Sequence, residues 1–102
     1  MGFAVSASEE ILHERKVKGQ YHKVAVDCWF TATGRMMPKM LKYMDDEGCL
    51  QTISNIRVKS REKKHYAGIL NQMFKCNAVI CGRVCEFVLL FDSKEGLWDM
   101  VT

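Results

Sequence analysis

Residues 24–31, Val-Ala-Val-Asp-Cys-Trp-Phe-Thr, indicate the fold class of this chain. Successive side chains of a β-strand point to opposite faces, so an apolar residue at every second position marks a half-buried strand. The apolar positions on one side of this stretch are Val24, Val26, Cys28 and Phe30. The stretch therefore predicts a strand with a mainly apolar face, and Trp29 lies on the opposite face.

Similar patterns continue on the C-terminal side of this stretch. Glycine-containing turns separate five further apolar or alternating segments. The spacing between these turns is typical of strands joined in antiparallel hairpins. The turns are predicted at Gly34, Gly48, Gly82 and Gly96. The further strands are predicted at 37–44, 50–61, 69–80, 84–91 and 97–101, with a bulge near Ser54 or Asn55 and a polar loop over 62–68.

The predicted fold class is all-β. Six strands in about 80 residues bury their apolar faces best as an antiparallel meander that curls into a small SH3-like or half-open barrel. The alternative is a flat sheet with an N-terminal helix packed across it. Ser6 and Glu9 fit a capping box, so residues 1–20 are predicted to form a short helix or arm and residues 21–102 the barrel domain. The predicted core is Val24, Val26, Phe30, Ile56, Val58, Phe87, Leu89 and Phe91.

The composition excludes several protein classes. The chain has 102 residues, 48% of them hydrophobic and 26% charged, as in one small globular domain. No apolar run reaches the ~18 residues of a membrane span, and we expect neither a secretory signal nor membrane association. An odd count of five cysteines favours reduced thiols and a cytoplasmic location.

No motif indicates catalysis or a cofactor. The spacing of Cys76, Cys81 and Cys85 lacks the paired Cys-x2-Cys of zinc sites, and no nucleotide-binding fingerprint is present. The acidic cluster 45–47 is typical of a turn. We therefore expect no enzyme, no cofactor and no metal, and a Cys-His pair assembled in space is the enzymatic alternative.

A basic ladder occupies alternate positions of the predicted third strand. Residues 57–64 hold five basic side chains against one acidic side chain, a local charge of +4 in a chain of total charge +3. The ladder consists of Arg57, Lys59, Arg61 and Lys63. A regular strand would project all four from one face, ~6.6–7 Å apart, which suits an anionic partner such as a single-stranded nucleic acid. Such residues also protect an exposed strand edge, which is the alternative interpretation.

Methionine and tryptophan indicate a second surface. Seven methionines are present, and four of them fall between residues 36 and 44. Methionine is over-used at adaptable binding surfaces, although it also fills cores. We predict an interface at Trp29, Met37 and Met40. The expected function is a non-enzymatic binding or protein-interaction module with a protein partner or as a homodimer, and the alternative is a nucleic-acid-binding barrel.

Several short motifs follow one another along the chain: Gly34-Arg35-Met36-Met37-Pro38, Asp46-Glu47-Gly48, residues 56–61, Phe74-Lys75-Cys76, Gly82-Arg83, residues 88–91 and Trp98. In this order they resemble the pattern of a family of small uncharacterised β proteins from Gram-positive anaerobes. The chain departs from this pattern at Cys81, Cys85 and Met100 and in its N-terminal arm. The resemblance implies a β-rich fold and no particular activity.

Overall fold

The computed structural model describes residues 18–66 and 69–102, and these residues form seven strands and no helix. The strands are β1 (Tyr21–Phe30), β2 (Met36–Met44), β3 (Leu50–Ile53), β4 (Arg57–Tyr66), β5 (Ile69–Ile80), β6 (Arg83–Asp92) and β7 (Leu97–Val101). All neighbours pair antiparallel in one sheet of order β3-β2-β1-β7-β6-β5-β4. The all-β antiparallel prediction is confirmed.

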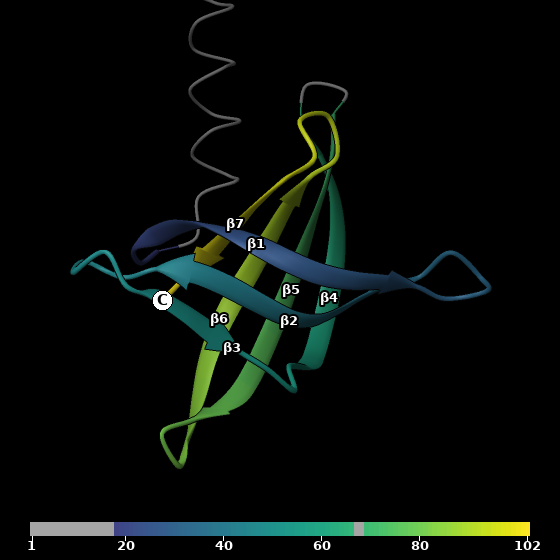
Figure 1. The fold of residues 1–102 in the computed structure, drawn as a ribbon. Helices are drawn as coiled ribbons and strands as arrows, with labels where there is room; N and C mark the ends of the chain where they lie inside the picture. The colour runs from purple at the N-terminus through teal and green to yellow at the C-terminus, as the bar shows by residue number, and fades with distance from the viewer. Residues whose placement is uncertain (1–17, 67–68) are drawn as a thin grey trace, which may run out of the picture.

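The sheet curls because β1 belongs to both of its halves. Residues 21–24 of β1 pair with β7, whereas residues 25–30 pair with β2. Figure 1 shows the result: β1, β2 and β3 cross over the strands β4 to β7. The Ile56 N–H donates to the Lys39 carbonyl at 3.1 Å, which joins the start of β4 to β2. The predicted half-open barrel is therefore confirmed, with β3 and β4 as its edge strands.

The prediction of six strands is wrong. The stretch from Leu50 to Arg61, expected to be one bulged strand, forms β3 and β4 at opposite ends of the sheet order. Asn55, with φ of 54°, turns the chain between them. The loop predicted over 62–68 is wrong for residues 62–66, because β4 pairs with β5 as far as Tyr66, and residues 67–68 lie outside the described residues. An edge strand meets solvent along its length, so its polar composition resembles that of a loop.

The N-terminal prediction lies almost wholly outside the described residues. Of the helix or arm expected over 1–20, only residues 18–20 are described, and they form no regular element. Two backbone hydrogen bonds between Gln20 and Thr102, of 3.1 and 3.0 Å, hold this short segment beside the end of β7.

The core fills the inner face, which we define as the face that carries the buried Leu41, Phe74 and Leu89; the outer face is the opposite one. Among the predicted core residues, Ile56, Phe87 and Leu89 are buried. Val24, Val26, Val58 and Phe91 are partly buried and pack against the same cluster. Phe30 is 67% exposed, so its predicted burial is wrong. Phe30 is the last residue of β1, and the β1–β2 turn that follows it extends beyond β4 (Figure 1).

The four predicted glycine turns are present. Gly34, Gly48, Gly82 and Gly96 have φ values of 82°, 82°, 76° and 70°, in the left-handed region that favours glycine. Within the described residues, no helix has the length and apolar character needed to span a bilayer.

Candidate functional site

The basic ladder is divided between the two faces of the sheet. Arg57 lies opposite Asn77 and Val58 opposite Cys76, but the next pair is Ser60 with Lys75, so Lys59 is an extra, bulged residue. A bulge shifts the alternation of a strand by one position. The prediction that all four basic residues share one face is therefore wrong: Arg57 and Lys59 belong to the outer face, and Arg61 and Lys63 to the inner one.

Arg61 connects two strands of the half-barrel. Its guanidinium Nη1 donates to the Met36 carbonyl on β2 at 2.6 Å, and its Cζ lies 5.7 Å from the centroid of the Phe74 ring. The side chain is half-buried. These contacts link the edge strand β4 to β2 and to the core, so Arg61 has a structural role.

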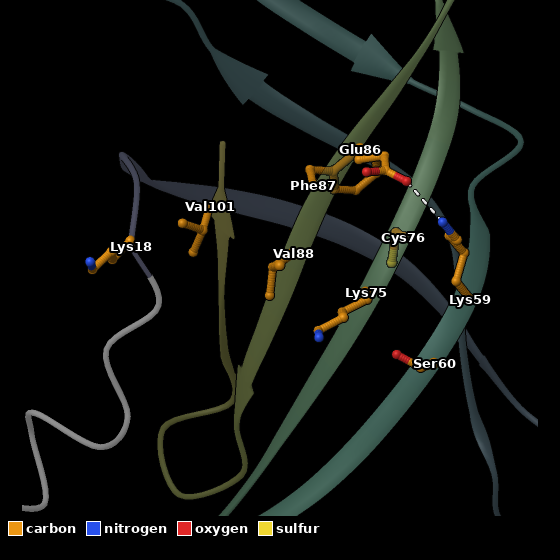
Figure 2. Close-up of a pocket in the computed structure, with 9 residues that line it drawn as sticks. All are labelled: Lys18, Lys59, Ser60, Lys75, Cys76, Glu86, Phe87, Val88 and Val101. Carbon is orange, nitrogen blue, oxygen red and sulfur yellow. Dashed lines mark hydrogen bonds and ion pairs between the residues drawn. The ribbon is translucent and has the colours of Figure 1, made fainter.

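The outer-face part of the ladder is partly neutralised. The Lys59 ammonium lies 2.8 Å from a Glu86 carboxylate oxygen (Figure 2), and this pair holds the pKa of Glu86 below its usual value. Arg57 is exposed at the start of β4. Lys63 is also exposed and lies opposite Gln72, away from both. The ladder thus presents no continuous basic groove, and its place on an edge strand agrees with the edge-protection interpretation.

The predicted interface residues do come together on the outer face. Trp29 lies directly opposite Met37. The next pair of cross-strand partners on this face is Asp27 and Met40. The register shift leaves Lys39 as a bulged residue, which brings Met37 and Met40 to the same face although they are three positions apart. Trp29 is 63% exposed, and the Lys39 ammonium lies 5.3 Å from its ring centroid.

The same outer face continues across β2 and β3 with two residues that we did not predict. Met44 and Leu50 are cross-strand partners and are 59% and 61% exposed. The sequence does indicate the position of Met44, because Met40, Lys42 and Met44 occupy alternate positions and therefore share one face of the strand. We call Trp29, Met37, Met40, Met44 and Leu50 the Trp29 face.

The cysteines offer little support for nucleophilic chemistry. Burial raises the pKa of the Cys76 thiol to about 12, offset in part by Arg61, and it also raises the pKa of Cys28, offset in part by a hydrogen bond with the Met37 backbone. All five cysteines are free. Within residues 18–66 and 69–102, no three His, Cys, Asp or Glu side chains are grouped so that they could hold a metal ion.

Comparison with known proteins identifies no relative: no family model, no curated protein and no solved structure matches this chain. The resemblance to small β proteins of Gram-positive anaerobes therefore stays a prediction.

Proposed function

We propose that this protein is a non-enzymatic interaction module that associates with a second copy of itself through the Trp29 face. The observation that carries the proposal is the exposed Trp29 ring, directly opposite Met37 on a paired strand. Tryptophan is enriched among the residues that dominate binding energy in interfaces. The odd number of free cysteines supports a cytoplasmic location as part of the same proposal.

The Lys39 ammonium helps to orient the Trp29 ring before a partner binds. A cation near an indole ring at an exposed site attracts the ring by ~0.5–1 kcal/mol and so favours the ring orientation seen here. Association then costs less side-chain entropy, because the anchor is partly ordered beforehand. The unbranched side chains of Met37 and Met40 can adapt to the surface that covers them.

A second copy fits the chemistry of this face. The Trp29 face is largely apolar, so two copies can cover each other's methionines and tryptophans. Asp27 and Lys42 lie on the same outer face in successive rows and supply opposite charges for pairing between copies. Three strands spaced ~4.8 Å apart and at most ten residues long give well under the ~800 Å² that each partner buries in a standard interface. We therefore expect a weak, concentration-dependent dimer.

Sedimentation velocity over a broad concentration range tests the proposal. The wild-type protein should shift from monomer to dimer, and Trp29→Ala should abolish the shift. Phe30→Ala is the matched control, because Phe30 is adjacent, 67% exposed and on the opposite face of β1. A protein that stays monomeric throughout, or a Phe30→Ala variant as defective as Trp29→Ala, would overturn the proposal.

Nucleic-acid binding through the basic ladder is the weaker proposal. The ladder is split into two pairs on opposite faces; Lys59 is already paired with Glu86, and Arg61 donates to the Met36 carbonyl.

A further inference from the structure

The outer face of β4 to β7 carries a groove that lies away from the Trp29 face. Its volume is about 460 Å³, within the size range of small-molecule sites. The lining residues, drawn in Figure 2, are Lys18, Lys59, Ser60, Lys75, Cys76, Glu86, Phe87, Val88 and Val101.

One row of cross-strand partners forms the groove. Ser60 on β4 lies opposite Lys75, Lys75 opposite Val88, and Val88 opposite Val101 on β7. Four strands at ~4.8 Å spacing make this row ~14 Å long. An apolar stretch of two valines thus adjoins a lysine and a hydroxyl group.

Gly19 brings a second lysine to the valine end of the row. A Cβ atom at Gly19 would lie 2.4 Å from the Thr102 carbonyl oxygen and 2.9 Å from Val101 Cγ1, and the φ of Gly19 is +138°. Only glycine allows this close approach. The segment therefore passes tightly over Val101, which is 3% exposed although it belongs to the outer face, and Lys18 lines the groove there.

The groove has an excess of positive charge. Three lysines and one glutamate line it, and Glu86 is bound to Lys59. Among the described residues, neither Lys18 nor Lys75 forms an ion pair with a carboxylate. Within the part of the chain that the structure describes, Lys18 and Lys75 thus flank the two valines without a carboxylate partner.

We propose that this groove binds a small organic anion whose charged headgroup contacts Lys75 and Ser60 and whose apolar body covers Val88 and extends toward Val101. The ammonium and the hydroxyl group both donate hydrogen bonds to an anionic oxygen. Val88 is partly exposed, so covering it removes apolar surface from water, whereas Val101 is already buried and closes the end of the row. The Glu86 carboxylate repels the anionic headgroup and competes with it for the Lys59 ammonium. This site shares no residue with the Trp29 face, so the result for anion binding in the groove is independent of the result for self-association.

Titration of the isotopically labelled full chain with octanoate, followed by NMR, tests the site. Octanoate should cause saturable shifts of the amide signals of Lys75, Val88 and Val101. Acetate lacks the apolar body and octanol lacks the charge, so both should bind more weakly. Shifts confined to other residues, or octanol binding as well as octanoate, would overturn the proposal.

Paired charge variants separate a local site from a general charge effect. Lys75→Gln should weaken octanoate binding about tenfold, equivalent to ~1.4 kcal/mol, whereas Lys94→Gln in the exposed β6–β7 turn should not. Glu86→Gln should tighten binding, a gain that misfolding does not produce, and Glu95→Gln in the same turn should have no effect. Equal effects of Lys75→Gln and Lys94→Gln, or no gain from Glu86→Gln, would refute the groove as the binding site.

Discussion

Replacement of Arg61 by alanine should destabilise the protein although Arg61 comes from a basic, largely exposed edge strand. The change removes the 2.6 Å hydrogen bond to the Met36 carbonyl and the contact with the Phe74 ring. A hydrogen bond from a charged group contributes ~1.5–3 kcal/mol, and a cation over an aromatic ring adds ~0.5–1 kcal/mol at an exposed site. Because Arg61 is half-buried, we take the lower end and expect a loss of ~2 kcal/mol in the free energy of unfolding.

Urea denaturation followed by circular dichroism measures this loss. For a domain of this size, ~2 kcal/mol corresponds to a fall in melting temperature of roughly 8–16 °C. Arg57→Ala is the matched control, since Arg57 begins the same strand on the outer face and should cost no more than ~0.5 kcal/mol. Arg61→Lys keeps the charge without the planar guanidinium and should fall between the two. The reasoning is refuted if Arg61→Ala costs no more than Arg57→Ala.

Two further predictions concern the core and the thiols. Leu89→Ala should cost ~2–5 kcal/mol in chemical denaturation, because Leu89 is 0% exposed and the change leaves a cavity; a loss below ~1 kcal/mol would contradict the packing described. In thiol labelling near neutral pH, the exposed Cys49 should react quickly and the buried Cys76 slowly, since burial raises the Cys76 pKa to about 12 and the thiolate is the reactive form. Cys49→Ser should therefore remove one rapidly labelled thiol and Cys76→Ser none, and an equal loss of rapid labelling from the two variants would contradict this order.

Local patterns predicted the strands and turns well because each depends on few neighbouring residues. The apolar run 84–91 falls within β6, and the four glycines occupy the left-handed turns expected of them. The out-of-phase residues around Asn55 predict a bulge, whereas the structure has a turn there. A turn and a simple bulge leave similar traces in the sequence, and the pairing of β3 with β2 and of β4 with β5 distinguishes them.

The basic ladder and the Trp29 face both show that the sequence of one strand does not decide which of its residues share a face. The alternation of Arg57, Lys59, Arg61 and Lys63 predicted one basic face, but the pairing of β4 with β5 inserts Lys59 as an extra residue and reverses the phase. A comparable bulge at Lys39 instead brings Met37 and Met40 together. A bulge depends on how a strand pairs with its partner, so the residues on each face of a long strand cannot be assigned from its own sequence alone.

The groove was absent from the predictions because its residues come from distant parts of the chain. Lys18, Lys59 and Lys75 belong to three separate segments, and Ser60, Val88 and Val101 are unremarkable in sequence. Their row exists only once β4, β5, β6 and β7 are paired in this register.

The pairing of β1 with β7 has a consequence for how the protein folds. It brings together segments as far apart as His22 and Thr102, which are 80 positions apart in the chain, whereas β1–β2–β3 and β4–β5–β6–β7 each form through short hairpin connections. Closure of a long loop costs more conformational entropy than closure of a hairpin, and proteins rich in such distant contacts fold slowly. We therefore expect the two hairpin units to form early and the β1–β7 seam to close last, so that this seam sets the folding rate.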